Sequence, residues 1–220
     1  MIPRFLAGSV LMAMATMIWP GSSHAASKEE IVRRLQKKYE ETVDLTADFV
    51  QETEVKALGK KVGYTGRVYF KKPSRMRWDY SAPKGQTIVA DGKFLWFYQP
   101  EEKQVIKTPL DSGFRPSLPV SFLVGLGNLE KDFLIQLLPE DEKVQGDQLK
   151  AVPRLGDSGL GELELVVDRK SSEIVEARIK DLAGNLTRIR LSHHQRQVGI
   201  KETLFRFKVP TGVDVVDASW

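Results

Sequence analysis

Residues 75–108 read RMRWDYSAPKGQTIVADGKFLWFYQPEEKQVIKT, and their pattern decides the fold class. In the first six residues, Met76, Trp78 and Tyr80 alternate with charged residues. Strict alternation is typical of a strand with one buried and one solvated face, which favours antiparallel pairing. Two apolar runs then flank Asp91-Gly92, a strong hairpin signal. The stretch therefore predicts a β-meander.

Strand patterns recur on both sides of this meander. Alternation is present in residues 44–55 and 66–72, and further strands are predicted in FLIQLL, LKAVPRL, GELELVVD, EIVEARIKDL, LTRIRLSHH and LFRFKV. About ten short strands with turn residues between them favour an all-β domain. We therefore expect a mainly β fold: a single, strongly curved antiparallel sheet, or unclosed β-barrel, with short helices capping an apolar concave face.

Two segments break the alternation. Residues 27–43 combine a capping box of Ser27 and Glu30 with apolar residues four apart, which predicts an amphipathic helix. Residues 111–132 are rich in proline and glycine around a short apolar helix predicted over 120–126. A breaker-rich segment of this length inside a meander is typical of a functional loop or lid.

The N-terminus has the pattern of a secretory signal peptide. Arg4 precedes an apolar run that ends near Trp19, and Ser23-x-Ala25 fits a cleavage site. We therefore expect residues 1–25 to be removed and residues 26–220 to form one exported domain. The chain has no cysteine, so its stability must come from a packed core and not from disulfides.

Motifs for catalysis fail on inspection. GDSG at 156–159 resembles a serine-protease string, but the only preceding histidine is His24, in the predicted signal peptide. His193 and His194 are adjacent on a predicted strand, so their side chains point to opposite faces and do not form a metal site. GLGNLE at 125–130 lacks the third glycine of a dinucleotide loop. We expect no enzyme activity, no metal and no cofactor.

Two features allow more than one interpretation. The large aromatic residues and Met76 could form an adaptable wall of a cavity, or they could be ordinary packed core. Between Lys56 and Arg77 there are eight basic residues and no acidic one. This run could meet a partner protein or anionic headgroups, or it could be a solvated surface. Nucleic acid is not an expected partner of an exported protein.

A set of ordered motifs resembles a known family. They are FVQ at 49–51, GRVYFKKP at 66–73, MRW at 76–78, PKGQTIVADGKFLWFY at 83–98, QV at 104–105 and FRFKVPTGV at 205–213. Together they resemble the outer-membrane lipoprotein carrier (LolA-type) family over essentially the whole mature chain. The resemblance implies a monomeric periplasmic carrier chaperone that binds the acyl chains of lipoproteins. It would receive them from an inner-membrane lipoprotein-releasing ABC transporter complex and deliver them to an outer-membrane receptor.

The resemblance and the strand pattern together suggest candidate site residues. The expected lipid cavity is lined by Leu35, Phe49, Val68, Phe70, Met76, Trp78, Leu95, Phe97, Phe122, Leu123 and Leu126. Residues 111–129 and the first helix form the expected lid. Lys72, where the family usually has arginine, is the expected lid latch. The expected partner-contact basic patch consists of Lys60, Lys61, Arg75 and Arg77.

Two other functions stay open at this point. A protein of the same fold could sense lipids or lipoproteins and regulate a partner without moving any cargo. Alternatively, it could carry another envelope amphiphile, such as a glycolipid.

Overall fold

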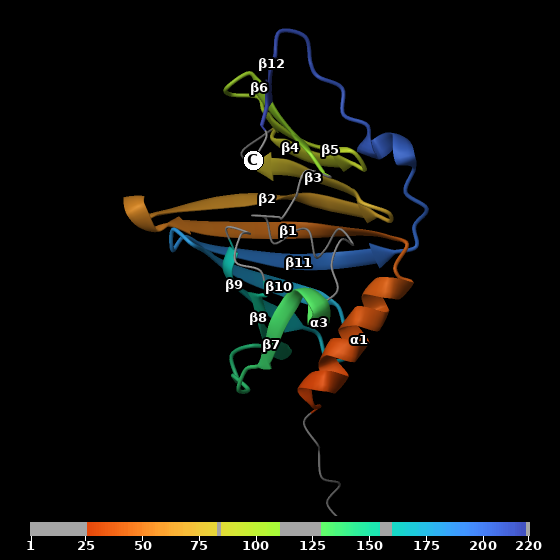
Figure 1. Cartoon of the computed structure of the whole chain (residues 1–220), viewed down its shortest axis with the longest axis vertical. Helices are drawn as coiled ribbons and strands as arrows, with labels where there is room; N and C mark the ends of the chain where they lie inside the picture. The colour runs from red at the N-terminus through yellow and green to blue at the C-terminus, as the bar shows by residue number, and fades with distance from the viewer. Residues whose placement is uncertain (1–25, 83–84, 111–128, 155–159, 219–220) are drawn as a thin grey trace, which may run out of the picture.

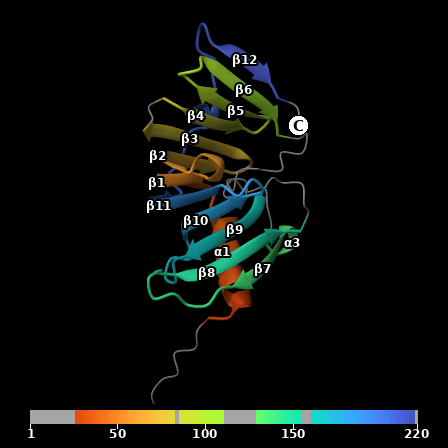
Figure 2. The ribbon, with the colours of Figure 1, turned by 90° about the vertical axis from the view of Figure 1, so that its left-hand side faces the viewer.

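One large, curved sheet dominates the computed structural model, which describes residues 26–82, 85–110, 129–154 and 160–218 (Figure 1). Its twelve strands lie in the order β12-β6-β5-β4-β3-β2-β1-β11-β10-β9-β8-β7. The strand directions turn progressively from one edge to the other, and the two edges do not meet (Figure 2). The expected unclosed β-barrel is confirmed.

The sheet consists of two meanders, β1 to β6 and β7 to β11, which join where β1 pairs with β11, and it has few helices. Their bounds are α1 Lys28–Glu41, β1 Asp44–Val55, η1 Lys56–Leu58, β2 Lys60–Lys71, β3 Arg75–Ala82, β4 Thr87–Asp91, β5 Phe94–Gln99, β6 Gln104–Pro109, α3 Leu129–Asp132, β7 Phe133–Leu137, β8 Asp147–Pro153, β9 Leu160–Val167, β10 Ile174–Asp181, β11 Leu186–Arg196, η2 Glu202–Phe205 and β12 Asp214–Asp217. The predicted helix over 120–126 and the motif at 156–159 lie outside the described residues.

Local sequence signals act as predicted at two places. Ser27 caps α1, because its Oγ accepts a hydrogen bond from the backbone N–H of Glu30 at 3.2 Å. The β4–β5 hairpin turns at Gly92, whose φ of 97° is accessible to glycine at little cost. Asp91 Oδ1 accepts the backbone N–H groups of Lys93 and Phe94, both at 2.8 Å, and so fixes this turn.

The main core lies on the concave side of the sheet. Alternate residues of each strand point to this side, as Ala47 and Phe49 do on β1 and Met76 and Trp78 do on β3. Helix α1 lies across one end of the sheet and adds Leu35 to the same buried cluster (Figure 1). The apolar alternation seen in the sequence therefore corresponds to one continuous apolar face.

The C-terminal segment corrects one expectation. LFRFKV at 204–209 was expected to be a strand, but it contains the end of the short helix η2 followed by an extended segment. Phe205 is buried, and the Phe207 ring stacks on Trp96 with centroids 5.6 Å apart. Trp96 points away from the concave core, so LFRFKV alternates because it covers the outer face. The chain then ends in β12, which pairs with β6 in parallel and departs from a purely antiparallel sheet.

Candidate functional site

A row of five aromatic rings crosses the concave face. Tyr64 contacts Tyr80 with ring centroids 5.8 Å apart, and Tyr80 contacts Phe49 at 5.1 Å. Phe49 lies 4.8 Å from Trp78, which lies 6.3 Å from Phe70. The row is half-buried at Tyr64 and Tyr80 and fully buried beyond them. It forms a continuous apolar track from the β1–β2 end of the sheet to the α1 end.

A glycine makes room for this row. A Cβ atom on Gly66 would lie 2.1 Å from the backbone oxygen of Asp79 and 2.7 Å from the Phe49 ring. Any side chain at this position of β2 would therefore displace either β3 or the ring. The GRVYFKKP motif begins at this glycine. The missing side chain of Gly66 lets the Phe49 ring lie against the sheet.

The predicted cavity residues that the structure describes lie together. Seven belong to one buried cluster on the concave side, and an eighth packs against that cluster while remaining half-buried: Leu35, Phe49, Val68, Phe70, Met76, Trp78 and Leu95, and then Phe97. Phe122, Leu123 and Leu126 lie outside the described residues. The neighbouring residues Trp96 and Phe97 face opposite sides, because side chains alternate along β5. Lipid contact by any of these residues remains a prediction.

A small apolar cavity of about 70 Å³ lies where α1 meets the sheet. It is lined by the α1 residues Leu35 and Tyr39, by the sheet residues Phe70 and Leu191, and by residues of the 172–174 turn. Pockets for drug-sized ligands measure roughly 300–1,000 Å³, so this cavity does not enclose a long acyl chain. Among the described residues, α1 therefore lies closed against this part of the sheet, and binding a long chain there would require α1 or its neighbours to move.

Lys72 holds the C-terminal end of α1. Its ammonium group donates hydrogen bonds to the backbone oxygens of Tyr39 and Glu40, the latter at 2.9 Å, and lies 4.7 Å from the centroid of the Tyr39 ring. The last carbonyls of a helix lack partners within the helix, and the helix dipole favours a cation beside them. Partial burial lowers the pKa of Lys72. These bonds connect the end of β2 to the helix that covers the concave face.

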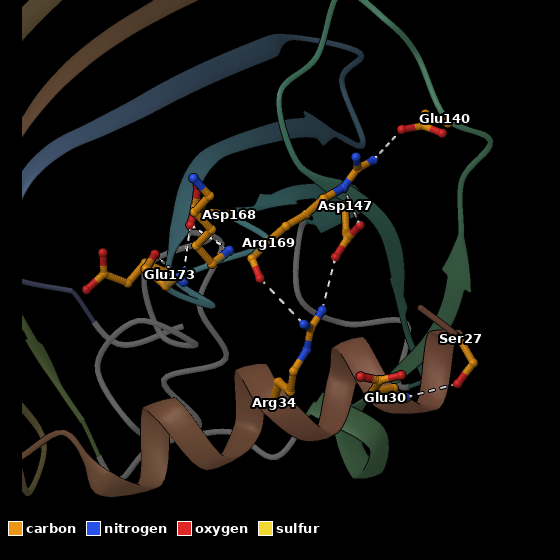
Figure 3. A network of polar contacts seen from close by, with 10 residues as sticks. Ser27, Glu30, Arg34, Glu140, Asp147, Asp168, Arg169 and Glu173 are labelled. Carbon is orange, nitrogen blue, oxygen red and sulfur yellow. Dashed lines mark hydrogen bonds and ion pairs between the residues drawn. The ribbon is translucent and has the colours of Figure 1, made fainter. Parts of the chain in front are cut away.

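A second attachment holds the middle of α1 (Figure 3). Arg34 Nη2 donates to Asp147 Oδ2 at 3.2 Å, and Arg169 Nε donates to Asp147 Oδ1 at 3.0 Å. Arg169 also pairs with Glu140 at 2.6 Å. Asp147 begins β8, and Arg169 lies in the β9–β10 turn, so this network connects α1 to the far half of the sheet.

A third attachment connects α1 to α3. Gln36 Oε1 accepts the backbone N–H of Leu129 at 3.3 Å, and Leu129 is fully buried. The family resemblance named Lys72 as the expected lid latch, a role that stays a prediction, whereas Arg34, Gln36 and Asp147 were not predicted. Their partners are distant in the sequence, and a polar residue on an amphipathic helix is not distinguishable in advance from a solvated one.

One buried polar atom stands out on the apolar wall. Trp78 Nε1 is buried, and it has no hydrogen-bond partner in the described part of the chain. An unpaired buried donor is unfavourable in a packed core. Apart from this N–H group, the Trp78 side chain is as apolar as the cluster around it.

The four residues of the predicted basic patch occupy two separate regions. Lys60 and Lys61 begin β2, whereas Arg75 is paired with Lys71 at the other end of that strand. Arg77 lies beside Asp79, which its Nε contacts at 2.8 Å, and it also donates to the backbone oxygen of Leu204. Nine residues of strand, at ~3.3 Å each, lie between Lys61 and Lys71. Partner contact by these residues remains a prediction.

The two adjacent histidines contact separate partners. His193 Nδ1 lies 3.0 Å from Asp48, while His194 Nε2 lies 3.2 Å from the backbone oxygen of Ile174, so the two rings have separate partners. Within the described ranges, no cluster of three His, Cys, Asp or Glu residues could hold a metal ion. No helix in these ranges is both long and apolar enough to span a membrane.

Comparison with known proteins identifies the family. The family model described as "Outer membrane lipoprotein carrier protein LolA" matches residues 40–208. The chain belongs to this family. Curated relatives named outer-membrane lipoprotein carrier proteins include one from Methylobacillus flagellatus, 29% identical over 97% of this chain and 98% of the relative. Another, from Chromobacterium violaceum, is 30% identical over 87% of this chain and 90% of the relative.

Solved structures support the fold. A conserved uncharacterised protein of Thermus thermophilus has a TM-score of 0.54 at 15% identity, over 86% of this chain and 98% of that one. A putative outer membrane lipoprotein-sorting protein domain of Vibrio parahaemolyticus has a TM-score of 0.50 at 12% identity, over 80% and 94% of the two chains. The LolA family is one of carrier proteins and not of enzymes, in agreement with the failed catalytic motifs.

Proposed function

We propose that this protein carries the acyl chains of lipoproteins across the periplasm on its concave face, beneath α1. The observation that carries the proposal is the continuous row from Tyr64 to Phe70, which ends at the helix held by Lys72. Family membership supports a lipoprotein as the cargo. The inner-membrane ABC transporter complex would supply the cargo, and an outer-membrane receptor would accept it from a monomeric carrier.

The energetics of acyl chains explain why such a carrier is needed. Burial of each CH₂ stabilises by about 0.8 kcal/mol, so moving one long chain into water costs on the order of 10 kcal/mol. A lipoprotein therefore does not cross an aqueous gap at a useful rate without a shield. The concave face supplies apolar area, with flexible Met76 among its aromatic residues.

The closed state explains how the cargo would be released. Opening α1 costs the free energy of its attachments before any contact with lipid forms. A binding-competent state that is only partly populated weakens the apparent affinity in proportion. The carrier would therefore hold its cargo less tightly than an open cavity would, and a receptor with an open site could remove it.

Native intact-mass analysis tests this function. The protein would be purified without detergent from cells that make acylated lipoproteins, with the transporter both present and depleted. We expect a bound triacylated lipoprotein only when the transporter is present. The protein should also take up a fluorescent fatty-acyl probe. Absence of both the lipoprotein and probe uptake would mean that the concave face is only a packed core.

A further inference from the structure

We propose that two neighbouring turns at one end of the sheet form a docking surface for an anionic phospholipid bilayer. They are the β1–β2 connection, which contains η1, and the β10–β11 turn. This surface, called here the leucine–lysine tip, consists of Lys56, Leu58, Lys60, Lys61, Lys180, Leu182 and Leu186. Docking would need no bound lipoprotein, so the proposal goes beyond the carrier function and can be tested separately from it.

Hydrogen bonds hold the two turns together as one unit. The backbone N–H of Lys56 donates to Asn185 Oδ1 at 3.0 Å. Asp181 accepts both the backbone N–H and the side-chain Nδ2 of Asn185, at 2.8 and 2.7 Å. At the left of Figure 1 the β1–β2 connection projects from the end of the sheet, while α1 lies at the right. The tip is therefore a preorganised projection remote from the helix.

Exposed leucines are concentrated on this projection. Leu58 is 67% exposed, Leu182 is 71% exposed and Leu186 is 50% exposed. Single exposed apolar side chains are normal on protein surfaces. Two leucines on these hydrogen-bonded turns, with Leu186 at the adjoining start of β11, are different, because turns usually carry polar residues that interact with water. A patch of this kind gains free energy if it enters an apolar phase.

The charge of the tip indicates which kind of apolar environment its leucines could enter. The tip has four lysines, and Arg178 and Arg188 lie beside it. The adjacent described carboxylates are Glu52, Glu54, Glu162, Glu164 and Asp181, which leaves a net charge of +1. Glu54 is already paired with Lys61 at 3.3 Å, and Asp181 is occupied by Asn185. Lysine stems can lie along a membrane surface while their ammonium groups reach phosphate. Leucines projecting among lysines therefore match an anionic bilayer, with its charged headgroups and apolar interior.

The position of the tip also fits the concave face. Val62 and Tyr64 follow the tip on β2, and Tyr64 is the half-buried start of the aromatic row. A bilayer docked at the tip would therefore lie next to the less buried end of the apolar track. The buried end, at Phe70, lies under α1.

Vesicle flotation with the purified protein tests the proposal. We expect binding at low salt to vesicles of phosphatidylethanolamine and phosphatidylglycerol, and much weaker binding to phosphatidylcholine alone. Each lysine near an anionic surface contributes about a fivefold change in partitioning. The double variants Leu58→Ser/Leu182→Ser and Lys56→Glu/Lys60→Glu should each lower binding at least about tenfold. The control Leu134→Ser removes a leucine of 52% exposure on β7. The control Lys201→Glu/Lys208→Glu makes the same charge change on exposed lysines elsewhere, and both controls should bind normally.

Because the chain has no cysteine, a single dye can report the position of the tip. An environment-sensitive dye on Leu182→Cys should shift to the blue when anionic vesicles are added, and the same dye on Leu134→Cys should not. Three results would each overturn the proposal. They are lack of binding to anionic vesicles, binding by both tip variants equal to that of the unchanged protein, and binding to phosphatidylcholine equal to that to anionic vesicles. So would a dye response that requires an added protein partner. Both tip variants should still take up the acyl probe in solution, which separates failure of docking from failure of the carrier function.

Discussion

Lys72, at the end of β2, donates a hydrogen bond from its ammonium group to the backbone oxygen of Glu40, in the last turn of α1, at 2.9 Å. This side chain is one of the attachments between the sheet and the helix that covers its apolar face. Because the same amine also bonds to the backbone oxygen of Tyr39, removing it would leave two helix-terminal carbonyls without this partner. The relationship gives the proposed latch a specific chemical basis.

Lys72→Met should weaken the closed state while keeping the apolar stem. Hydrogen bonds to a charged group are worth about 1.5–3 kcal/mol, so we expect stability to fall by roughly that amount. Easier opening should strengthen the apparent affinity for an acyl probe by about tenfold. Fluorescence titration of the probe measures this change, with Lys208→Met as the control on an exposed lysine. An affinity that is unchanged or weaker would exclude Lys72 as a latch.

Lys72→Arg should act in the opposite direction. The planar fork of arginine offers more donors to the same two carbonyls than an ammonium group does. We expect a tighter closed state, a severalfold weaker apparent affinity and slower probe uptake in stopped-flow measurements. A stronger apparent affinity or faster uptake would show that the arginine fork does not fit the end of α1.

The network around Asp147 should control the middle of α1. Asp147→Asn removes the charge that pairs with both Arg34 and Arg169. We expect amides in α1 to exchange with deuterium about tenfold faster, since charged hydrogen bonds of this kind contribute about 1.5 kcal/mol or more. Lys143→Gln, on an exposed lysine of the β7–β8 connection, is the control. Unchanged exchange in α1 would show that the network contributes nothing to closure.

Gly66→Ala should disrupt the aromatic row. The new Cβ would meet the Asp79 backbone oxygen and the Phe49 ring, and overpacking of this kind costs about 3 kcal/mol. Gly63→Ala on the same strand is a matched control, because no atom lies within 4 Å of its added Cβ. Urea unfolding should show a large loss of stability for Gly66→Ala and a change within about 0.5 kcal/mol for Gly63→Ala. Similar losses for both would contradict the close approach.

Alkaline pH should destabilise the fold through Tyr80. Burial raises the pKa of this tyrosine to about 12, above its ordinary value of 10.0. The folded state therefore holds the Tyr80 proton more tightly than the unfolded state does. The stability that protonated Tyr80 contributes is complete below pH ~10 and is lost as the pH rises toward 12. The loss is on the order of 2–3 kcal/mol. Burial raises the pKa of Tyr39 as well, so the alkaline loss in Tyr80→Phe should be smaller but not absent. Equal pH profiles of urea unfolding for the two proteins would refute this assignment.

The strands and the concave residues could be predicted from the sequence because both depend on local alternation. Met76 and Trp78 face the core because their neighbours Arg75 and Arg77 are charged, and a strand has only two faces. Phe94 to Tyr98 is apolar on both faces, so alternation alone does not show which face is inward; Phe207 stacks on Trp96 and covers the outer face. The same covering segment explains why LFRFKV resembled a strand.

Long-range polar contacts could not be predicted in the same way. The basic run appeared to be one patch because Lys60 and Arg75 are close in the sequence, but they lie at opposite ends of β2. Conversely, Lys56 and Asn185 are remote in the sequence yet hydrogen-bonded. A linear pattern shows which face a residue occupies, but it does not show which strand end lies beside another.

Site-specific photo-crosslinking tests the central claim most directly. Benzoylphenylalanine would replace either Phe97, on the concave side, or its neighbour Trp96, on the outer side. Each protein would be irradiated in cells that make acylated lipoproteins and then analysed for crosslinked lipoprotein. Acyl-chain binding on the concave face predicts a strong crosslink from position 97 and little from position 96. A crosslink from position 96 alone, or none from position 97 in a folded protein, would contradict it.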